Sequence, residues 1–191
     1  MAEIHILIAQ DNELAARTLE EQLTSLGYRV VGIASTADTV RLCEQLRPDL
    51  VLMDMQTPEL SGDVAKEISE RTATPIVIIT ALSDVASIHK AEEARALAYL
   101  IKPVNPEELP PAIDVALARH RELQQLREHV EELHETLESR KLIERAKGIL
   151  MKRQNIGEAE AEERLRQRAK EKQTSIKDIA QGIVDSDALL R

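Results

Sequence analysis

Aromatic residues are almost absent from this chain of 191 residues, which contains no Phe, no Trp and only two Tyr. Any hydrophobic core must therefore be built from aliphatic side chains. Cys43 is the only cysteine, so no disulfide framework can form within the chain. We expect Cys43 to be a small apolar residue that faces the core from a helix.

Long apolar runs are also missing. No stretch approaches the roughly 18 consecutive apolar residues that a membrane-spanning helix requires. The first five residues, Met-Ala-Glu-Ile-His, do not resemble a secretory signal. We expect a cytoplasmic protein with no membrane partner, made of one α/β domain of ordinary size and a smaller helical part.

Charge is distributed unevenly along the chain. Residues 1–104 carry 9 Lys or Arg against 16 Asp or Glu, and residues 105–139 carry 3 against 9. Residues 140–191 carry 13 against 9, a net charge of +4. Any contact with a nucleic acid is therefore expected after about residue 140. Interspersed charges of this kind also suit an ordinary solvated helix surface.

Before Pro103 the hydrophobic pattern alternates between short apolar runs and amphipathic segments. The pattern predicts strands at 4–9, 29–34, 50–53, 76–80 and 98–101, and helices at 13–26, 36–46, 61–71 and 83–94. Strands and helices that alternate over short connections form a parallel sheet covered on both faces. The predicted fold class is therefore α/β, with a doubly wound, five-stranded parallel sheet.

Polar residues stand where the predicted strands end. Asp11 follows the first strand, Asp54 follows the third, Thr80 ends the fourth and Lys102 follows the fifth. Because the carboxyl ends of parallel strands meet at one edge of a sheet, these side chains are expected to converge. Taken singly, each is an ordinary turn or surface residue. Taken together, two carboxylates, a hydroxyl and a lysine indicate a site for phosphoryl transfer.

The order of these residues resembles the receiver domain of bacterial two-component response regulators, over residues 4–104. The resemblance implies that Asp54 accepts a phosphoryl group from a histidine kinase. It also implies that Mg²⁺ is bound by Asp11, Asp54 and the backbone carbonyl of Gln56. A haloacid-dehalogenase-like phosphatase also uses an Asp after a strand, but it has a second Asp where this chain has Gln56. We therefore do not expect an enzyme.

Other positions of the receiver pattern are also recognisable. The resemblance implies that Lys102 pairs with the phosphoryl oxygens and that Thr80 donates a hydrogen bond to one of them. Tyr99 matches the family's switch aromatic, whose exposure follows the position of Thr80. The family usually has two acidic residues after the first strand, and here the first is Gln10. We expect this loss of a carboxylate to weaken Mg²⁺ binding.

A long helix is predicted after the sheet. Asn105-Pro106 suits the start of a short turn at 106–109, and the helix is expected to restart at Pro110-Pro111 and continue to about residue 153. Apolar residues within it are spaced 3, 4, 3 and 4 apart, as in a heptad seam. They are Leu123, Leu126, Val130, Leu133 and Leu137. The seam is expected to pair in a possible homodimer or to pack within the chain.

Residues 139–184 carry a second resemblance. The sequence Ala-Lys-Gly-Ile-Leu-Met at 146–151, with segments 161–169 and 175–180, resembles the ANTAR domain, a small three-helix RNA-binding module. The usual aromatic of its second helix is replaced by Glu162, whose charge would repel RNA. The candidate RNA contacts are Arg140, Lys147, Gly148, Lys152, Arg153, Arg166 and Arg168. The expected domains are a receiver at 1–104, a helical linker at 105–138 and an ANTAR domain at 139–191.

Together the two resemblances imply a phosphorylation-dependent response regulator whose output binds RNA stem-loops of leader transcripts and controls transcription antitermination. An alternative is a signalling adaptor whose helical tail binds a protein, which Glu162 and the acidic segment 105–139 favour. A DNA-binding helix-turn-helix is less well supported, because no suitable glycine turn precedes 174–184.

Overall fold

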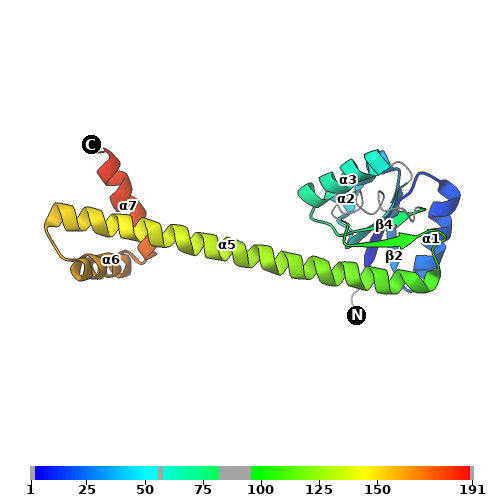
Figure 1. Ribbon diagram of the computed structural model, residues 1–191. Coiled ribbons are helices and arrows are strands. Elements are labelled where there is room, and N and C mark those ends of the chain that lie inside the picture. The colour runs from blue at the N-terminus through cyan, green and yellow to red at the C-terminus, as the bar shows by residue number, and fades with distance from the viewer. Residues whose placement is uncertain (1–2, 56–57, 82–95, 190–191) are drawn as a thin grey trace. The chain divides into compact units, whose positions relative to one another are not determined.

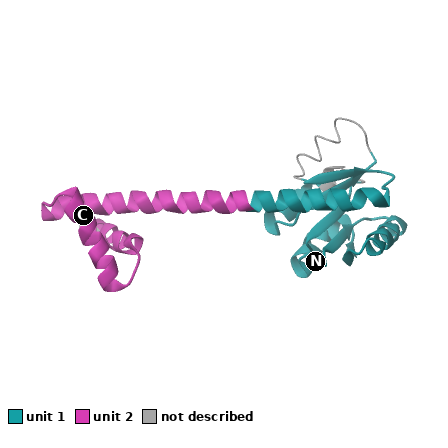
Figure 2. Cartoon of the chain, turned by 90° about the horizontal axis from the view of Figure 1, so that it is seen from below, with its two compact units in different colours: residues 1–124 teal, residues 125–191 magenta. Residues whose placement is uncertain are grey.

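The computed structural model describes residues 3–55, 58–81 and 96–189 (Figure 1). These residues form two compact units, residues 1–124 and 125–191, which are distinguished in Figure 2. The helix predicted at 83–94 and the proposed metal ligand Gln56 lie outside the described residues. None of the described helices is long and apolar enough to cross a membrane.

The first unit is built on a five-stranded sheet. Its strands are β1 (His5–Ala9), β2 (Arg29–Ala34), β3 (Leu50–Asp54), β4 (Ile76–Thr80) and β5 (Ala98–Ile101). They lie in the order β2-β1-β3-β4-β5, and every neighbouring pair is parallel. The predicted doubly wound parallel sheet is confirmed.

Side chains that alternate along the strands form two separate cores. On β1, Leu7 and Ala9 pack against α2 (Thr39–Leu46) and α3 (Pro58–Arg71). The intervening residues Ile6 and Ile8 pack on the other face against α1 (Glu13–Ser25) and the first turns of α5 (Leu109–Gln154). Because both faces are covered, β3 and β4 are buried along their whole length.

Local chemistry explains where the structure differs from the predicted boundaries. The third helix begins at Pro58 rather than at residue 61, because proline suits the first turn of a helix. The helix predicted at 36–46 opens as a short 3₁₀ turn, η1 (Thr36–Asp38), before α2. The Ser35 hydroxyl caps this turn by accepting a hydrogen bond from the Asp38 N–H at 3.2 Å.

Cys43 is buried in the core beneath α2, as expected. Burial raises the pKa of the Cys43 thiol to about 12, with a further contribution from the Glu44 carboxylate. The thiol therefore stays protonated at neutral pH, and Cys43 serves as a small apolar core residue.

The long helix α5 follows a 3₁₀ turn, η2 (Pro106–Glu108), as the proline pattern predicts. Pro110 and Pro111 fall in its first turn, where backbone N–H groups have no partner within the helix. The helix then continues without a break to Gln154. The predicted linker and the first helix of the predicted third domain are therefore one element.

The second unit contains the end of α5, α6 (Glu158–Lys172) and α7 (Ile176–Leu189). Its core is centred on four buried residues, Ala146, Leu165, Ala180 and Val184. Acidic residues stand in the first turn of α6 and basic residues in its last turn, an order that complements the helix dipole. Ser175 caps α7, where its hydroxyl accepts a hydrogen bond from the Asp178 N–H at 3.0 Å.

Candidate functional site

Backbone hydrogen bonds fix the strand ends that carry the predicted phosphoryl site. The Met55 N–H, just after Asp54, donates to the Ile79 carbonyl at 2.8 Å. The Lys102 N–H donates to the Thr80 carbonyl at 2.7 Å. Residues from β3, β4 and β5 are thus held at one edge, as the sequence pattern predicts.

Asp54 is the charged centre of this edge. Its side chain is buried, with only 3% of the residue exposed. The ammonium of Lys102 lies 2.5 Å from Asp54 Oδ2. The amide of Gln10 donates a hydrogen bond to the same oxygen. A buried carboxylate is tolerated when it is paired and hydrogen-bonded, and these two donors meet that condition.

Asp11 makes a different set of contacts. Its Oδ1 accepts a hydrogen bond from the Thr36 N–H at 3.0 Å, and its Oδ2 accepts one from the Thr36 hydroxyl at 2.8 Å. Asp11 therefore ties the end of β1 to the turn after β2. Sequence reasoning missed Thr36, because a threonine that follows a strand carries no distinctive signal.

The two predicted switch residues differ in exposure. Thr80 is buried at the end of β4, directly beside the strand that carries Asp54. Tyr99 lies on β5, the edge strand, and 54% of it is exposed. The structure therefore shows Tyr99 in an outward position.

In the second unit, Lys147 is not a surface cation. It is 5% exposed, and its ammonium lies 2.8 Å from both Glu144 and Glu158. A third carboxylate, Glu162, lies 4.0 Å away. Lys147 joins α5 to α6, so its ammonium is engaged by carboxylates of this unit. Glu162 also accepts a hydrogen bond from Arg166, so its charge is compensated inside the unit.

Exposed cations instead form a stripe along one face of α5. Lys141, Arg145, Gly148 and Lys152 are all exposed and follow one another at steps of four, three and four residues. We call these four residues the α5 stripe. Lys141 pairs with Glu138 at 2.8 Å, and no ion pair involves Arg145 or Lys152 among the described residues. Sequence reasoning included Gly148 and Lys152 but missed the other two.

Gly148 lies at an open position on α5. A Cβ atom built at this position would meet nothing within 4 Å. Glycine inside a helix costs about 1 kcal/mol relative to alanine. No close approach to another described residue explains this glycine, and the same holds for Gly182 in α7.

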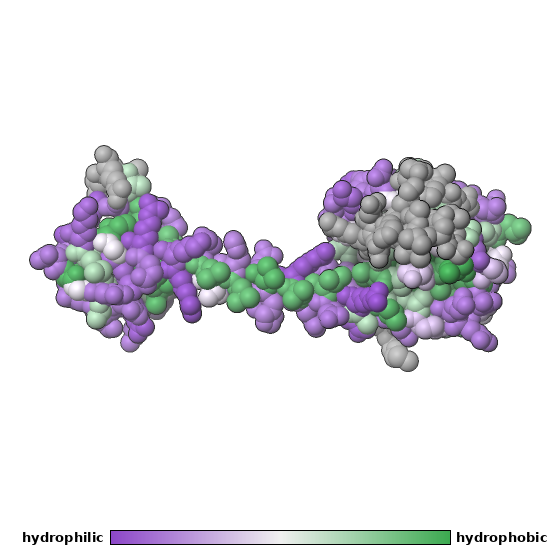
Figure 3. Space-filling model, in the orientation of Figure 1, coloured by the Kyte–Doolittle hydropathy of each residue, from purple (hydrophilic) through white to green (hydrophobic). Residues whose placement is uncertain are grey.

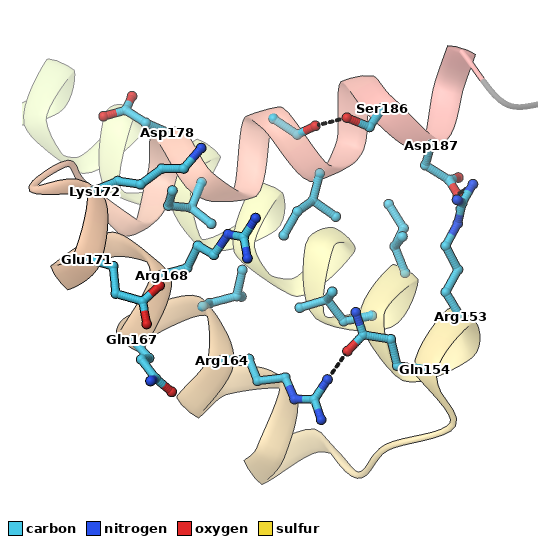
Figure 4. Close-up of a pocket in the computed structure, with 16 residues that line it drawn as sticks. Arg153, Gln154, Arg164, Gln167, Arg168, Glu171, Lys172, Asp178, Ser186 and Asp187 are labelled. Carbon is cyan, nitrogen blue, oxygen red and sulfur yellow. Dashed lines mark hydrogen bonds and ion pairs between the residues drawn. The ribbon is translucent and has the colours of Figure 1, made fainter.

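A groove of about 650 Å³ lies between α5, α6 and α7 (Figure 4). Its floor is made of leucine and isoleucine side chains, and its rim carries Arg153, Arg164, Arg168 and Lys172. Arg153 is paired with Asp187 at 2.6 Å. Arg168 extends into the groove from α6, and no ion pair involves it among the described residues.

Comparisons with known proteins agree with this geometry. The response regulator receiver domain family matches residues 6–114, and the ANTAR domain family matches residues 131–184. This chain belongs to the response regulators. The transcriptional regulatory protein PdtaR of Mycobacterium tuberculosis is 39% identical over 183 residues, which are 95% of this chain and 89% of that protein. Both predicted family resemblances are confirmed.

Solved structures support the fold of the first unit. The receiver domain of a modulated diguanylate cyclase from Desulfovibrio desulfuricans is 32% identical, with a TM-score of 0.57, over 63% of this chain and 98% of that one. A LuxR-family response regulator from Aurantimonas is 29% identical, with a TM-score of 0.56, over 61% and 86%. Neither the receiver family nor the ANTAR family is a catalytic family. This chain is a response regulator with an RNA-binding antitermination domain.

Receiver domains typically bind Mg²⁺ at their acidic site, and the donor chemistry of this response regulator fits that ion. Asp11 and Asp54 supply carboxylate oxygens from the ends of neighbouring strands β1 and β3. Mg²⁺ is usually held by one or two carboxylates together with several waters. The described residues contain no cluster of three or more acidic, His or Cys side chains that could hold a metal.

The ion pairs of Lys147 with Glu144 and Glu158 are expected to stabilise the second unit, and this can be tested. We expect Lys147→Met to lower the melting temperature of the full chain, because it strands Glu144 and Glu158 without their shared cation. Lys152→Met, which removes an exposed cation from the same helix, should leave it unchanged. Equal melting temperatures for the two variants, measured by circular dichroism, would contradict a structural role for Lys147.

The same cluster should respond to acid. The hydrogen bonds that the Lys147 ammonium donates to Glu144 and Glu158 raise the pKa of Lys147. The bond to Glu158 also lowers the pKa of that carboxyl group. The stabilisation from Glu158 is present above the ordinary glutamate pKa and is lost as the pH falls through the lowered one. The difference in melting temperature between Lys147→Met and the wild type should therefore shrink in acid.

Proposed function

We propose that Asp54 accepts a phosphoryl group from the phosphohistidine of a kinase. The observation that carries the proposal is the buried Asp54 carboxylate, paired with Lys102 at 2.5 Å. A carboxylate oxygen attacks phosphorus, the phosphorus–nitrogen bond breaks, and its electron pair leaves with the histidine. The Lys102 ammonium stays beside the phosphoryl oxygens and offsets their charge.

Mg²⁺ would be held by Asp11, Asp54 and the carbonyl of Gln56, and when bound it would supply further charge neutralisation. Thr80, at the end of β4, would donate its hydroxyl hydrogen to a phosphoryl oxygen. Tyr99 would then leave its exposed position and turn inward as Thr80 moves. This change at β5 is the proposed signal of the phosphorylated state.

Asp54→Asn should abolish Mg²⁺-dependent labelling by acetyl phosphate, because an amide is a poor nucleophile although it has almost the same shape. The control is Asp63→Asn, which changes an exposed carboxylate on α3 and should keep full labelling. Labelling is measured by intact-protein mass spectrometry, with circular dichroism to verify folding. Retained labelling of a folded Asp54→Asn protein would refute the assignment.

For the second unit, the proposal is that the α5 stripe contacts the phosphate backbone of an RNA stem-loop. Cations supply the sequence-independent part of nucleic-acid binding, and Gly148 lets the backbone approach α5 closely. The further candidates Arg140, Arg153, Arg166 and Arg168 are all exposed. Arg153 and Arg166 have acidic partners, Asp187 and Glu162, whereas Arg140 and Arg168 have no ion pair among the described residues.

The groove of the second unit is proposed to accept an unstacked base of the RNA loop. Single-stranded RNA is commonly recognised by stacking of its bases on aromatic or arginine side chains. Both tyrosines, Tyr28 and Tyr99, lie in the first unit, and the lining of the groove contains no histidine, so stacking in the groove would fall to arginine. Arg168, which extends into the groove over an apolar floor, is the side chain best placed to stack on a base.

Gly148→Ala tests whether RNA approaches α5 closely at this position, because its expected effect on RNA affinity is opposite to its effect on helix stability. The variant should raise helix stability by about 1 kcal/mol. It should weaken binding to RNA hairpin pairs by about tenfold, equivalent to roughly 1.4 kcal/mol. Ser139→Ala, which also favours helix but lies on the opposite side of α5, should leave affinity unchanged. Affinity is measured by fluorescence anisotropy on the phosphorylated protein.

The outcomes of this experiment distinguish the candidate functions. Unchanged affinity of Gly148→Ala would remove the α5 stripe from the RNA interface. Failure of the phosphorylated wild-type protein to bind any hairpin pair would favour the signalling adaptor. Binding to duplex DNA in preference to hairpins would favour a DNA-binding output.

The heptad seam of α5 is proposed to pair with a second copy of the chain. Its five apolar residues are between 41% and 62% exposed, and Figure 3 shows apolar residues along this stretch. In a coiled coil, Leu123, Val130 and Leu137 would occupy a positions, and Leu126 and Leu133 would occupy d positions. Glu122 and Arg127 fall at g and e positions, where a parallel partner would bring opposite charges together.

Pairing would connect phosphorylation to RNA binding. Two copies of the second unit would match an RNA that carries two hairpins, and avidity would raise the affinity without new contacts. Complete reversal of a two-state population requires about 5.5 kcal/mol of differential stabilisation. Two heptads and one phosphoryl group are more consistent with a partial shift toward the dimer.

Leu126→Lys/Leu133→Lys should abolish phosphorylation-dependent dimerisation, because it places charges in the seam. RNA affinity should fall with it and lose its dependence on phosphorylation. Gln125→Lys/Ser139→Lys adds the same charge outside the seam and should preserve both. Sedimentation velocity and RNA binding measure the two effects. A seam variant that remains a phosphorylation-responsive RNA binder would show that the output works as a monomer.

A further inference from the structure

Gln10 occupies the position at which the receiver pattern usually has an acid, and the structure shows what the amide does there. Gln10 is buried, with 7% of the residue exposed. Its Oε1 accepts a hydrogen bond from the Asn12 N–H at 3.0 Å. Its Nε2 donates to Asp54 Oδ2. The amide therefore bridges the loop after β1 and the carboxylate at the end of β3.

The two contacts require an amide in one orientation. A backbone N–H can only donate a hydrogen bond, and an ionised carboxylate can only accept one. A glutamine side chain satisfies both groups at once. A glutamate of the same length could still accept from Asn12, but it would face Asp54 with a second negative charge.

Among the contacts that the described residues make, the charges at the buried centre are one carboxylate and one ammonium. Asp54 carries one negative charge, Lys102 carries one positive charge, and Gln10 carries none. Asp11 is exposed, and both of its oxygens accept hydrogen bonds from Thr36. An acid at position 10 would leave the centre with excess negative charge, which a bound cation or a proton shared by the two carboxylates would have to offset.

We infer that Gln10 is a positioning residue that holds the Asp54 carboxylate in place of a divalent cation while the receiver is unphosphorylated. The metal-free receiver is then stable, and Mg²⁺ must compete with the Gln10 amide for the Asp54 carboxylate. The inference builds on the proposed role of Asp54, because it explains how the phosphoacceptor is kept ready at low Mg²⁺ concentration.

Gln10→Glu tests this inference. Without Mg²⁺, the variant should melt at a lower temperature than the wild type, because two carboxylates meet in a buried place. Mg²⁺ should raise its melting temperature far more than that of the wild type. Its dissociation constant for Mg²⁺, measured by calorimetry, should fall by about tenfold or more, since an added charge acts at short range and partly out of solvent. Sodium chloride at equal ionic strength should not reproduce the effect.

Two further variants separate the charge from the hydrogen bonds. Gln10→Met keeps the length of the side chain but removes both contacts, so it should lower the melting temperature with no additional rescue by Mg²⁺. In an Asp54→Asn background, Gln10→Glu should no longer destabilise the metal-free protein, because the amide that replaces the Asp54 carboxylate can donate a hydrogen bond to the new acid. Together these variants show whether repulsion at Asp54 is the cause.

If Gln10→Glu has the melting temperature and Mg²⁺ affinity of the wild type, Gln10 does not substitute for a cation. Labelling of Asp54 by acetyl phosphate is read separately from the melting curves. If the melting behaviour is as expected but Asp54 is not labelled, the role of Gln10 is supported and the assignment of Asp54 as the phosphoacceptor is wrong.

Discussion

Burial of the Asp54 carboxylate at the end of β3 is the constraint on which the first unit depends. The sheet order places β3 between β1 and β4, so the carboxylate is surrounded by strand ends and excluded from water. Lys102 from the loop after β5 and Gln10 from the loop after β1 reach the same carboxylate oxygen. This cluster therefore joins segments that lie far apart in the chain, and it forms only when the sheet is folded.

The second unit also contains a buried charged side chain, but here the buried group is an ammonium rather than a carboxylate. Lys147 is buried and held by carboxylates from both α5 and α6. A buried charge is stable only when it is paired, and the acidic start of α6 supplies one of the partners. Glu162, whose charge disfavours RNA binding when only the sequence is considered, is thus paired with Arg166 and lies near Lys147. The cations left on the surface, including three in the α5 stripe, are those that remain for a polyanionic ligand.

A single helix connects the two units through the chain, because α5 begins in the core of the first unit and ends in the core of the second. Its first turns bury Leu109, Ile113 and Ala116 against the sheet, and its last turns bury Ala146. The stretch between them exposes its apolar seam. The helix is therefore buried at both ends and exposed in the middle, where the proposed pairing with a second copy would take place.

Residue patterns along the chain were enough to predict the fold class, the strands at 29–34, 76–80 and 98–101, and the convergence of Asp54 and Lys102 at one edge. These features follow from hydrophobic periodicity and from the rule that parallel strands end together, and both are local or topological. The folded chain was needed to show that Gln10 contacts Asp54, that Asp11 is bonded to Thr36, and that Lys147 is buried rather than exposed. Each of these depends on which charged or polar groups meet across distant elements. The pattern of residue types does not contain that information, because a lysine on a helix has the same sequence signature whether its face meets water or three carboxylates.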